Sequence, residues 1–364
     1  MSVSKVIRTA PLLGPDPLRR GKRRRNNTVL IAALAAALLV SMVLGVAIGP
    51  VWIEPRDVLR VVWSHLTDAG AAGAGSVADV IVWDVRLPRV LMGVAVGAGL
   101  AVCGAALQAM VRNMLADPYL LGINSGASAG AAATILFGFG AGLGQHALAG
   151  SAFIGALAAS LLVFVVARAA GRITSVRLLL AGVAAGYALS ALTSFLIFTS
   201  GSAEGARSVM FWLLGSLALS QWGTPLAALG AVIAFTTAIL VLWARRLDAL
   251  AIGDETALAL GVRPTRFRTQ LLVLVSLCTG FIVAAAGSIG FVGLVIPHLA
   301  RRLVGAAHAW SIPAAALLGS VFLLWADLLS RMLLQPRELP VGIVTAMLGA
   351  PFLLWLVRRM RPAA

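Results

Sequence analysis

Apolar runs about as long as a membrane is thick recur along the chain from residue 28 onward, and they constrain its fold more than any other feature. Of the 364 residues, 60% are hydrophobic and only 12% are charged. A water-soluble domain has about 25% charged residues, so this chain has too little polar surface to coat a soluble globule. The sequence predicts an all-α, polytopic membrane protein.

The apolar runs divide into ten predicted spans. A hydrocarbon core about 30 Å thick is crossed by roughly 20 apolar helical residues, because each segment must pair its own backbone polar groups. The predicted spans are residues 28–49, 87–110, 118–138, 147–168, 177–199, 223–244, 269–286, 290–304, 311–331 and 340–357. They form a transmembrane domain at 28–358, which follows a cationic, disordered cytoplasmic tail at 1–27 and precedes a short cytoplasmic tail at 359–364.

Basic residues set the predicted orientation. Counted on alternate sides of the ten spans, 22 of the 29 Lys and Arg residues fall on the side of the N-terminus and 7 on the other side. The positive-inside rule therefore places both termini in the cytoplasm. The net charge of +16 is explained by topology and by contact with anionic lipid headgroups, so no nucleic-acid partner is expected.

Residues 86–89 (Arg-Leu-Pro-Arg) open the predicted second span. A proline in the first helical turn lacks only a donor that would be unpaired there, so the motif predicts a helix start at the outer surface. Near the same surface, Asp327 and Arg331 lie four residues apart on one predicted helix. Side chains at that spacing share a helix face, so we expect the two to pair.

Two further motifs bend the chain. In the turn at residues 108–122, Asp117 is a predicted N-cap and Pro118 the first helical residue of the third span. Glycines and a proline between residues 287 and 297 predict an interrupted helix, which must be buried in protein or line a cavity. His298 follows, and we expect it to be structural or to contact a partner, since no second metal ligand lies near it in sequence.

The longest polar loop on the cytoplasmic side, residues 245–268, contains a short predicted helix. Asp254 is its predicted N-cap, Glu255 makes its first turn acidic, and Gly261 ends it. A helix this short is marginal alone, so we expect it to dock against another surface. The arginines of the loop, Arg268 among them, either pair with acidic groups of a partner or set the topology.

The outer loop at residues 50–81 contains an amphipathic stretch that begins at Pro55 and is predicted to lie at the membrane interface. The two cysteines, Cys103 and Cys278, each lie inside an apolar run. They offer neither a disulfide framework nor a metal cluster, and we expect both to be small buried hydrophobes.

Together these motifs resemble the FecCD family, the permease subunits of binding-protein-dependent ABC importers for ferric siderophores, haem and cobalamin. The resemblance covers about residues 50–358, with Met114 where the family has the first proline of its Arg-Asn-Pro-Leu-Ala turn. An inverted repeat of spans two to five against spans seven to ten is faint in the sequence and is typical of many transporters. The residues that carry the resemblance include Arg86, Pro88, Arg89, Gln108, Asn113, Pro118, Gly122, Gly290, Gly293, Pro297 and His298.

The resemblance implies roles for three further groups of residues. The short cytoplasmic helix is implied to be the coupling helix that fits a cleft of the ATPase subunit, with Gly253, Asp254, Glu255, Thr256, Ala257, Leu258, Leu260 and Gly261. Outer arginines are implied to pair with glutamates of the binding protein, with lipid phosphate as the alternative, and the candidates are Arg56, Arg60 and Arg337. The fifth and tenth spans are implied to line the substrate path, through Ser190, Thr193, Ser194, Val341, Gly342 and Thr345.

The resemblance therefore implies a permease subunit of an ATP-driven importer in the bacterial cytoplasmic (inner) membrane. Its first expected substrate is a ferric siderophore, with haem or cobalamin as the alternatives. The expected partners are ATPase subunits, a substrate-binding protein, a second permease subunit, identical or paralogous, and membrane lipid. No catalytic residue, metal site or cofactor is expected in the chain itself. ATP and Mg²⁺ would bind the ATPase, since the sequence contains no Gly-x-x-x-x-Gly-Lys-Ser/Thr loop.

Two hypotheses from other classes compete with this one. An ion-coupled secondary transporter normally needs an ionisable residue in mid-membrane, and only Asp327 comes near that depth. A membrane-embedded enzyme is disfavoured, because the spans contain no His/Asp or Ser/Lys constellation at membrane depth. Co-purification of an ATPase would separate the importer from both alternatives.

Overall fold

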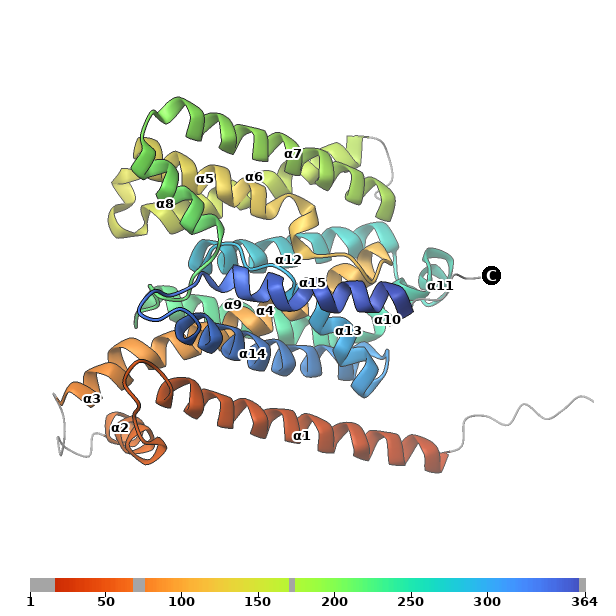
Figure 1. Cartoon of the computed structure of the whole chain (residues 1–364). Coiled ribbons are helices and arrows are strands. Elements are labelled where there is room, and N and C mark those ends of the chain that lie inside the picture. The colour runs from red at the N-terminus through yellow and green to blue at the C-terminus, as the bar shows by residue number, and fades with distance from the viewer. Residues whose placement is uncertain (1–16, 68–75, 170–173, 360–364) are drawn as a thin grey trace, which may run out of the picture.

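The structure, a computed structural model, describes residues 17–67, 76–169 and 174–359. Its long helices run side by side in a bundle (Figure 1). The elements are α1 (Pro17–Ala47), α2 (Pro55–Thr67), α3 (Val77–Val80), the π-helix η1 (Ile81–Arg86), α4 (Leu87–Val111), the 3₁₀-helix η2 (Pro118–Leu121), α5 (Ile123–Phe137), the 3₁₀-helix η3 (Ala141–His146), α6 (Ala147–Ala169), α7 (Ser175–Ser200), α8 (Ala203–Leu213), α9 (Thr224–Leu242), α10 (Ala244–Ile252), α11 (Asp254–Ala259), α12 (Pro264–Ala286), α13 (Val292–Val304), α14 (His308–Met332) and α15 (Val341–Arg359).

Each of the ten predicted spans corresponds to a helix. Within the described residues, seven helical stretches are long and apolar enough to cross a membrane, and α5 and α15 are shorter apolar helices. The eighth predicted span corresponds to α13. Helix α11, the start of α1 and the end of α15 lie at one end of the bundle, and α2 and α8 lie at the other (Figure 1). We refer to these as the cytoplasmic end and the outer end, in keeping with the distribution of basic residues.

Helix α1 begins at Pro17, although the sequence predicted a disordered tail up to residue 27. Lys and Arg favour helices, and the apolar helix beside them extends into this stretch at no new nucleation cost. Asn27 binds α1 to the end of α13, because its amide donates to the carbonyl of Val304 at 3.0 Å. The rest of the predicted tail, residues 1–16, and residues 360–364 lie outside the described residues.

The second span begins at Val77, so the predicted helix start at Arg86 was wrong. The chain passes from α3 through the π-helix η1 into α4 without leaving the helical region. Pro88 lacks an N–H, and just before it the N–H of Leu87 bonds to the carbonyl of Val82, five residues back. A widened π turn therefore carries the helix past the proline.

The core surrounds α4, which packs against α14, α12, α13 and α9. Two glycines of α4 bring the backbones of these helices together. A Cβ on Gly104 would overlap the carbonyl of Gly293 in α13, and one on Gly97 would overlap the carbonyl of Gly319 in α14. Small residues at such crossings allow the close packing by which membrane helices associate.

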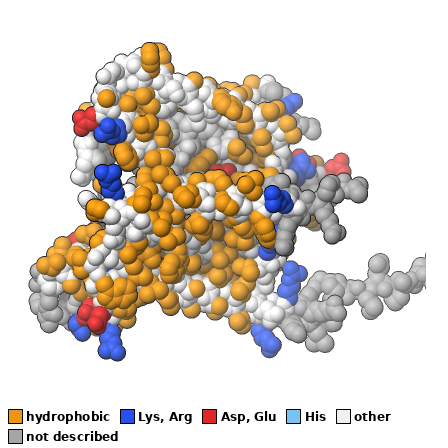
Figure 2. Space-filling model, viewed as in Figure 1, with side chains coloured by type: hydrophobic (Ala, Val, Ile, Leu, Met, Phe, Trp, Pro, Cys, Tyr) orange, Lys and Arg blue, Asp and Glu red, His pale blue; other side chains and the backbone are white. Residues whose placement is uncertain are grey.

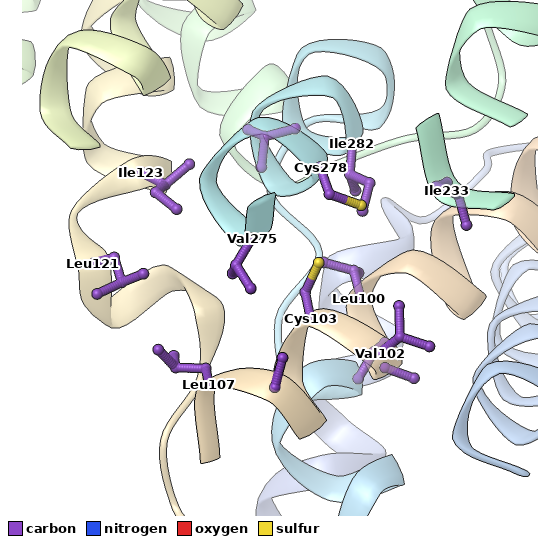
Figure 3. Close-up of a cluster of buried hydrophobic side chains, with 14 of the residues drawn as sticks. Leu100, Val102, Cys103, Leu107, Leu121, Ile123, Ile233, Val275, Cys278 and Ile282 are labelled. Atoms are coloured by element: carbon purple, nitrogen blue, oxygen red, sulfur yellow. The ribbon is translucent and has the colours of Figure 1, made fainter. Parts of the chain in front are cut away.

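Cys103 of α4 and Cys278 of α12 lie inside this core, where their side chains point toward each other (Figure 3). Both are fully buried free thiols among aliphatic side chains such as Leu100, Val275 and Ile282. The prediction that both cysteines act as small buried hydrophobes is confirmed.

An irregular segment precedes α13, as the sequence predicted. Helix α13 has 13 residues, or about 20 Å, which is shorter than a hydrocarbon core of about 30 Å. The hydroxyl of Tyr119 donates to the carbonyl of Ile289 at 3.1 Å and accepts from the Ile289 N–H at 3.0 Å. The protein thus supplies partners for irregular backbone that lipid would leave unpaired.

A second irregular segment precedes α5, which begins at Ile123. Asp117 is the N-cap, as predicted, and accepts from the N–H of Tyr119 at 2.9 Å, but the helix that it caps is the 3₁₀-helix η2. The prediction that Pro118 starts the third span was therefore wrong. These two interrupted helices are the third and eighth spans, which correspond in the inverted repeat. The repeat itself stays a prediction.

Candidate functional site

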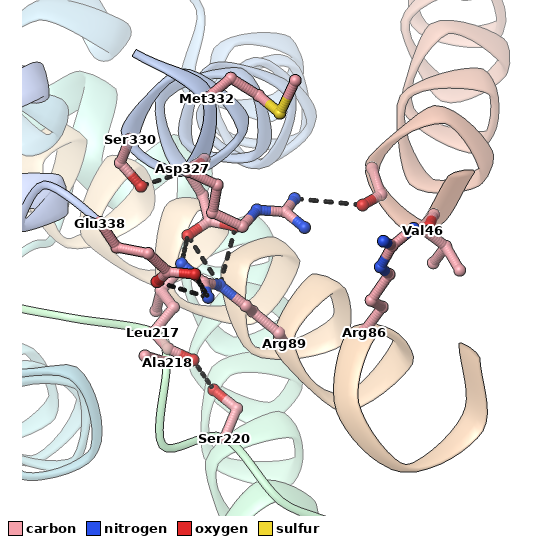
Figure 4. Close-up of polar contacts among 12 residues, drawn as sticks. Val46, Arg86, Arg89, Leu217, Ala218, Ser220, Asp327, Ser330, Met332 and Glu338 are labelled. Carbon is pink, nitrogen blue, oxygen red and sulfur yellow. Dashed lines mark hydrogen bonds and ion pairs between the residues drawn. The ribbon is translucent and has the colours of Figure 1, made fainter. Parts of the chain in front are cut away.

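Four charged side chains gather near the outer end and form what we call the outer ion cluster: Arg89, Asp327, Arg331 and Glu338. Figure 4 shows the guanidinium of Arg89 beside the carboxylates of Asp327 and Glu338. Arg89 donates to Asp327 Oδ1 through Nη2 at 2.9 Å and to Glu338 Oε2 through Nη1 at 2.9 Å. Arg331 Nε lies 3.2 Å from Asp327 Oδ2, which confirms the predicted pair. Asp327 is 1% exposed, so its charge is compensated inside the chain.

Arg86 closes the outer end of α1. It donates to the carbonyls of Val46 at 2.7 Å, Ala47 at 3.0 Å and Val51 at 2.6 Å. The carbonyls of a last helical turn have no donor within the helix, and the guanidinium supplies one. Gly49 leaves room for it, because a Cβ there would overlap the guanidinium of Arg86. The two arginines of the first motif thus join α1, α4 and α14 at this end.

The second motif joins α4 to α13. The amide of Gln108 donates to the carbonyl of Leu294 at 3.1 Å and accepts from Arg301 Nη2 at 2.6 Å. Asn113 stays in the turn, where its Oδ1 accepts from the N–H of Leu115 at 2.9 Å. The motif also places Pro118 against Gly293 and gives Gly122 a left-handed conformation with φ of 72°.

The third motif lies in and before α13. Gly290 has open space around it, and Pro297 is inside the helix. His298 is largely buried, and its Nε2 has no hydrogen-bond partner in the described part of the chain. Within the same residues, no group of three or more His, Cys, Asp or Glu side chains is arranged to hold a metal ion.

The predicted coupling helix is present as α11, with six residues. Gly261 ends it as predicted: its N–H bonds to the carbonyl of Leu258, and the N–H of Val262 bonds to that of Ala257. This pair of bonds is a Schellman motif, for which the left-handed φ of 78° at Gly261 is well suited. The N-cap, however, is Gly253 and not Asp254, so that part of the prediction was wrong.

Asp254 instead forms the inner ion cluster with Arg268 and Arg112. Its carboxylate accepts from Arg268 Nη2 at 2.7 Å and Nη1 at 2.9 Å, while Arg112 lies 3.8 Å away. The hydrogen bonds and charge of Arg268 hold the pKa of Asp254 below its ordinary value. Leaving a buried guanidinium without a carboxylate costs more free energy than leaving this helix without a side-chain cap. Asp254 therefore pairs with Arg268 and does not cap α11.

Arg268 connects α11 to the long helices of the bundle. It is 1% exposed and also donates to the carbonyl of Met110 at the end of α4 and to the hydroxyl of Ser175 at the start of α7, each at 3.3 Å. The alternative that Arg268 reaches a partner is therefore wrong, because its donors are used inside the chain. Displacement of α11 would act on α4, α7 and α12 through this one side chain.

Large apolar side chains are exposed on α11 and at its two ends. Ile252, Leu258 and Leu260 are 70%, 58% and 65% exposed, and only Ala257 is buried. Glu255 is exposed beside them, and Thr256 is half-buried. These leucines lie outside the membrane spans and do not pack into the core of the chain. Such exposed apolar side chains are typical of a surface that binds a protein partner.

Helix α10, which the sequence did not predict, holds the same loop from the other side. Asp248 accepts from His308 Nδ1 at 2.6 Å and from the His308 N–H at 3.0 Å, so it caps the start of α14. The loop that contains α10 and α11 is thus bound to α14 as well as to α4, α7 and α12.

Residues 37–359 match the model of the FecCD transport family. The chain belongs to the FecCD transport family. A FecCD permease is a transport subunit and not an enzyme, and this one is a multi-pass protein of the bacterial inner membrane. The matched residues include every residue of the outer and the inner ion cluster.

Several proteins are similar to this chain over most of its length. The chain is 43% identical over 300 residues to the cobalamin import system permease protein BtuC of Halobacterium salinarum, covering 81% of this chain and 79% of that protein. It is 43% identical over 285 residues to the hemin transport system permease protein HmuU of Yersinia pestis, covering 77% and 84%. A solved ABC transporter of proposed metal-chelate type, in an inward-facing conformation, has a TM-score of 0.80 at 32% identity, covering 92% of this chain and 100% of that one.

The residues predicted for the substrate path of this FecCD permease do not share one environment. On α7, Ser190 and Ser194 are exposed, whereas Thr193 is buried and donates to the carbonyl of Leu189 at 3.0 Å. On α15, Val341 and Thr345 are buried. Gly342 packs against the carbonyl of Leu214. Helix α7 lies at one edge of the bundle and α15 in the middle of the face in Figure 1, so one subunit does not bring the two together.

The predicted docking arginines of the permease lie at its outer end. Arg56 and Arg60 are exposed on α2, and Arg337 is exposed in the loop before α15. Arg60 already pairs with Asp57 at 2.7 Å. Helix α8, which the sequence did not predict, lies at the same end and carries exposed Arg207. A capping signal at Ser202, whose hydroxyl accepts from the N–H of Gly205, could have revealed it.

Proposed function

We propose that this FecCD permease carries a ferric siderophore from a substrate-binding protein into the cytoplasm, with energy from a separate ATPase. The pump would contain two such permease subunits and two ATPases, and the path would lie between the permeases. The single observation that carries this proposal is the exposed apolar surface of α11, which is joined to the membrane helices through Arg268.

The coupling step follows from those contacts. A cleft of the ATPase would cover Leu258 and Leu260, with Gly253, Gly261, Thr256 and Glu255 shaping the helix and its rim. Closure of the ATPase on nucleotide would displace α11, and the bidentate contact between Asp254 and Arg268 would pass that displacement to α4 and α7. A bidentate ion pair suits this role because its two charge-assisted hydrogen bonds resist being pulled apart.

The substrate class rests on the relatives and on the charge of the path. Relatives are named for cobalamin, hemin and Fe(3+)-citrate import, and a metal held in an organic ligand is common to all three. A path with the exposed hydroxyls of Ser190 and Ser194 and few charges suits a large chelate whose metal is already wrapped. A ferric siderophore fits this description, and haem and cobalamin are the second candidates, favoured by the two relatives at 43% identity.

An ion-coupled mechanism finds less support. It would need an ionisable group that exchanges ions at membrane depth. Asp327 is the candidate, but Arg89 and Arg331 hold its carboxylate. Both oxygens of this carboxylate already have guanidinium partners inside the chain, which leaves no free position for an exchanging ion.

Uptake of labelled ferric siderophore, haem and cobalamin tests the proposal in a deletion strain. The strain is complemented with the wild type or with a variant in which residues 253–261 are scrambled. Iron-chelate uptake that needs both the gene and the intact segment supports the proposal. Loss of haem or cobalamin uptake alone would overturn the choice of substrate, and unchanged uptake of all three would overturn the importer.

A further inference from the structure

Helix α2 is held against the bundle along one face only. Val58 is 2% exposed and packs with Val46, Val82 and their neighbours in a small apolar cluster at the outer end. At the end of α2, His65 stacks on Trp83 of η1 with ring centroids 4.1 Å apart. These two contacts fix the rotation of α2 about its axis, so its outward face is defined.

The outward face of α2 contains an apolar sector. Leu59, Trp63 and Leu66 are 57%, 67% and 70% exposed. At 3.6 residues per turn these three positions lie on one side of the helix, next to the buried side that contains Val58. Three large apolar side chains in a row are costly to leave in water, at about 25 cal/mol for each Å² of apolar surface.

A charged sector lies beside the apolar one. Arg56 and Arg60 follow it around the helix, and Asp57 and Ser64 lie farther round, away from Leu59. The order is therefore buried, apolar, cationic and then polar. This order matches the layers at a membrane surface, where acyl chains give way to phosphate groups and then to water.

The place of α2 in the chain puts it at that surface. It follows the outer end of α1, which crosses the membrane with most of its apolar length unburied, and it precedes the helix that crosses as α4. Figure 1 shows α2 beside α1 at the edge of the bundle farthest from α7, one of the two path helices. In Figure 2, hydrophobic side chains cover this corner, with charged side chains along its lower edge.

From the juxtaposition of these sectors we infer that α2 is a lipid anchor in the outer leaflet. Leu59, Trp63 and Leu66 enter the acyl region, and Arg56 and Arg60 bind the phosphate groups of phospholipids above it. Asp57 pairs with Arg60 and orients the guanidinium toward the headgroups. Arg56 and Arg60 are thereby assigned to lipid, and docking of a binding protein is left to other residues of the outer end. This inference does not depend on which substrate is carried.

Spin labels measure the depth of α2 in the full chain, reconstituted in vesicles of phosphatidylcholine and phosphatidylglycerol. Single-cysteine sites are made by Leu59→Cys, Trp63→Cys and Ser64→Cys, and the native Cys103 and Cys278 are buried and stay unlabelled. Collision with oxygen reports the acyl region, and collision with a water-soluble nickel chelate reports water. The ratio of the two is expected to be severalfold higher at 59 and 63 than at 64.

Other outcomes overturn the anchor. Labels at 59 and 63 that meet the nickel chelate, and become immobile only when binding protein is added, would make α2 a binding-protein dock. Labels shielded from both reagents without binding protein would indicate contact with a second permease. In either case each variant must remain monodisperse and take up substrate, so that misfolding does not imitate the result.

The arginines are tested separately. Arg56→Ala with Arg60→Ala is expected to move the label at 63 toward water, because the phosphate contacts that set its depth are lost. Arg337→Ala removes an exposed arginine of the same end that is not on α2, and it is expected to leave the depth unchanged. An unchanged depth in the double variant would overturn the role of the two arginines.

Discussion

The outer and inner ion clusters both bury an arginine, but they differ in what surrounds it. In the outer cluster Arg89 lies between Asp327 and Glu338, and all the groups come from α4, α14 and the loop before α15. In the inner cluster Arg268 is as buried, yet its partner Asp254 has a side chain that is 39% exposed and lies on a six-residue helix. The outer cluster contains a buried carboxylate, Asp327, which is 1% exposed, and the 44% exposed side chain of Glu338 lies at its edge. In the inner cluster the carboxylate that holds the buried arginine is itself partly exposed.

This difference indicates different roles for the outer and the inner ion cluster. A buried carboxylate that two arginines hold keeps helices in fixed positions, and Asp327 does this for α4 and α14. A charge pair that connects a buried arginine to an exposed helix passes on displacements made from outside. The following predictions test this contrast, beginning with the largest effect.

Arg89→Ala is expected to be the most damaging change. It leaves Asp327 and Glu338 without their shared partner, and removing one member of a buried pair costs about 3–5 kcal/mol. Thermal unfolding of the purified permease measures the loss. A loss as small as that of an exposed pair would contradict the view that this cluster holds α4 against α14.

Asp254→Asn is expected to reduce stability less and activity more. The pair with Arg268 is partly solvated, so we expect a cost of about 1–2 kcal/mol. Uptake driven by ATP should fall by a larger fraction than Arg89→Lys causes at equal folded yield. Equal uptake in the two variants would remove the distinction between the clusters.

The same variant makes a prediction about pH. Arg268 lowers the pKa of Asp254, so the contribution of the ionised carboxylate is present above the unfolded pKa of about 3.9 and is lost as pH falls through the lowered value. The stability difference between wild type and Asp254→Asn should stay constant from pH 7 to about pH 4 and shrink below that. A difference that already shrinks between pH 7 and pH 5 would show that Arg268 does not hold this carboxylate.

Asp248→Ala tests whether α10 holds the loop that contains α11 against α14. It removes the side-chain cap of α14 and the contact with His308, and loss of a cap costs about 1 kcal/mol. Hydrogen exchange should rise at the start of α14 and in α10. No change there would mean that α10 does not hold the coupling segment.

Arg60→Ala is the matched control with the smallest effect. Its pair with Asp57 lies on the surface of α2, with the arginine side chain 71% exposed, and such pairs contribute about 0–1 kcal/mol. Thermal unfolding in detergent should be nearly unchanged. A loss that approaches that of Arg89→Ala would show that exposure does not separate the two kinds of pair.

Local features of the fold could be predicted from the sequence. The pair of Asp327 and Arg331 follows from a spacing of four, the stop at Gly261 from the conformational freedom of glycine, and the interrupted helix before α13 from its glycines and proline. The amphipathic helix that begins at Pro55 is present as α2. In each case the signal and the structure lie within a few residues.

Contacts between distant segments could not be predicted. Arg89 and Asp327 are 238 residues apart, and Arg268 meets Met110 across 158 residues. The start of the second span was missed because a proline that normally begins a helix follows a π turn here. The predicted cap at Asp254 failed because a buried arginine, invisible in the local sequence, competes for the same carboxylate.

Association with an ATPase tests most directly whether α11 is the coupling surface. Leu258→Glu with Leu260→Glu places charge on that surface, and Leu219→Glu, at an 86% exposed position outside α11, is the matched control. We predict that the double variant loses the co-purifying ATPase and ATP-driven uptake while its thermal unfolding stays that of the wild type, and that the control keeps all three. A double variant that still holds the ATPase and transports would contradict the claim.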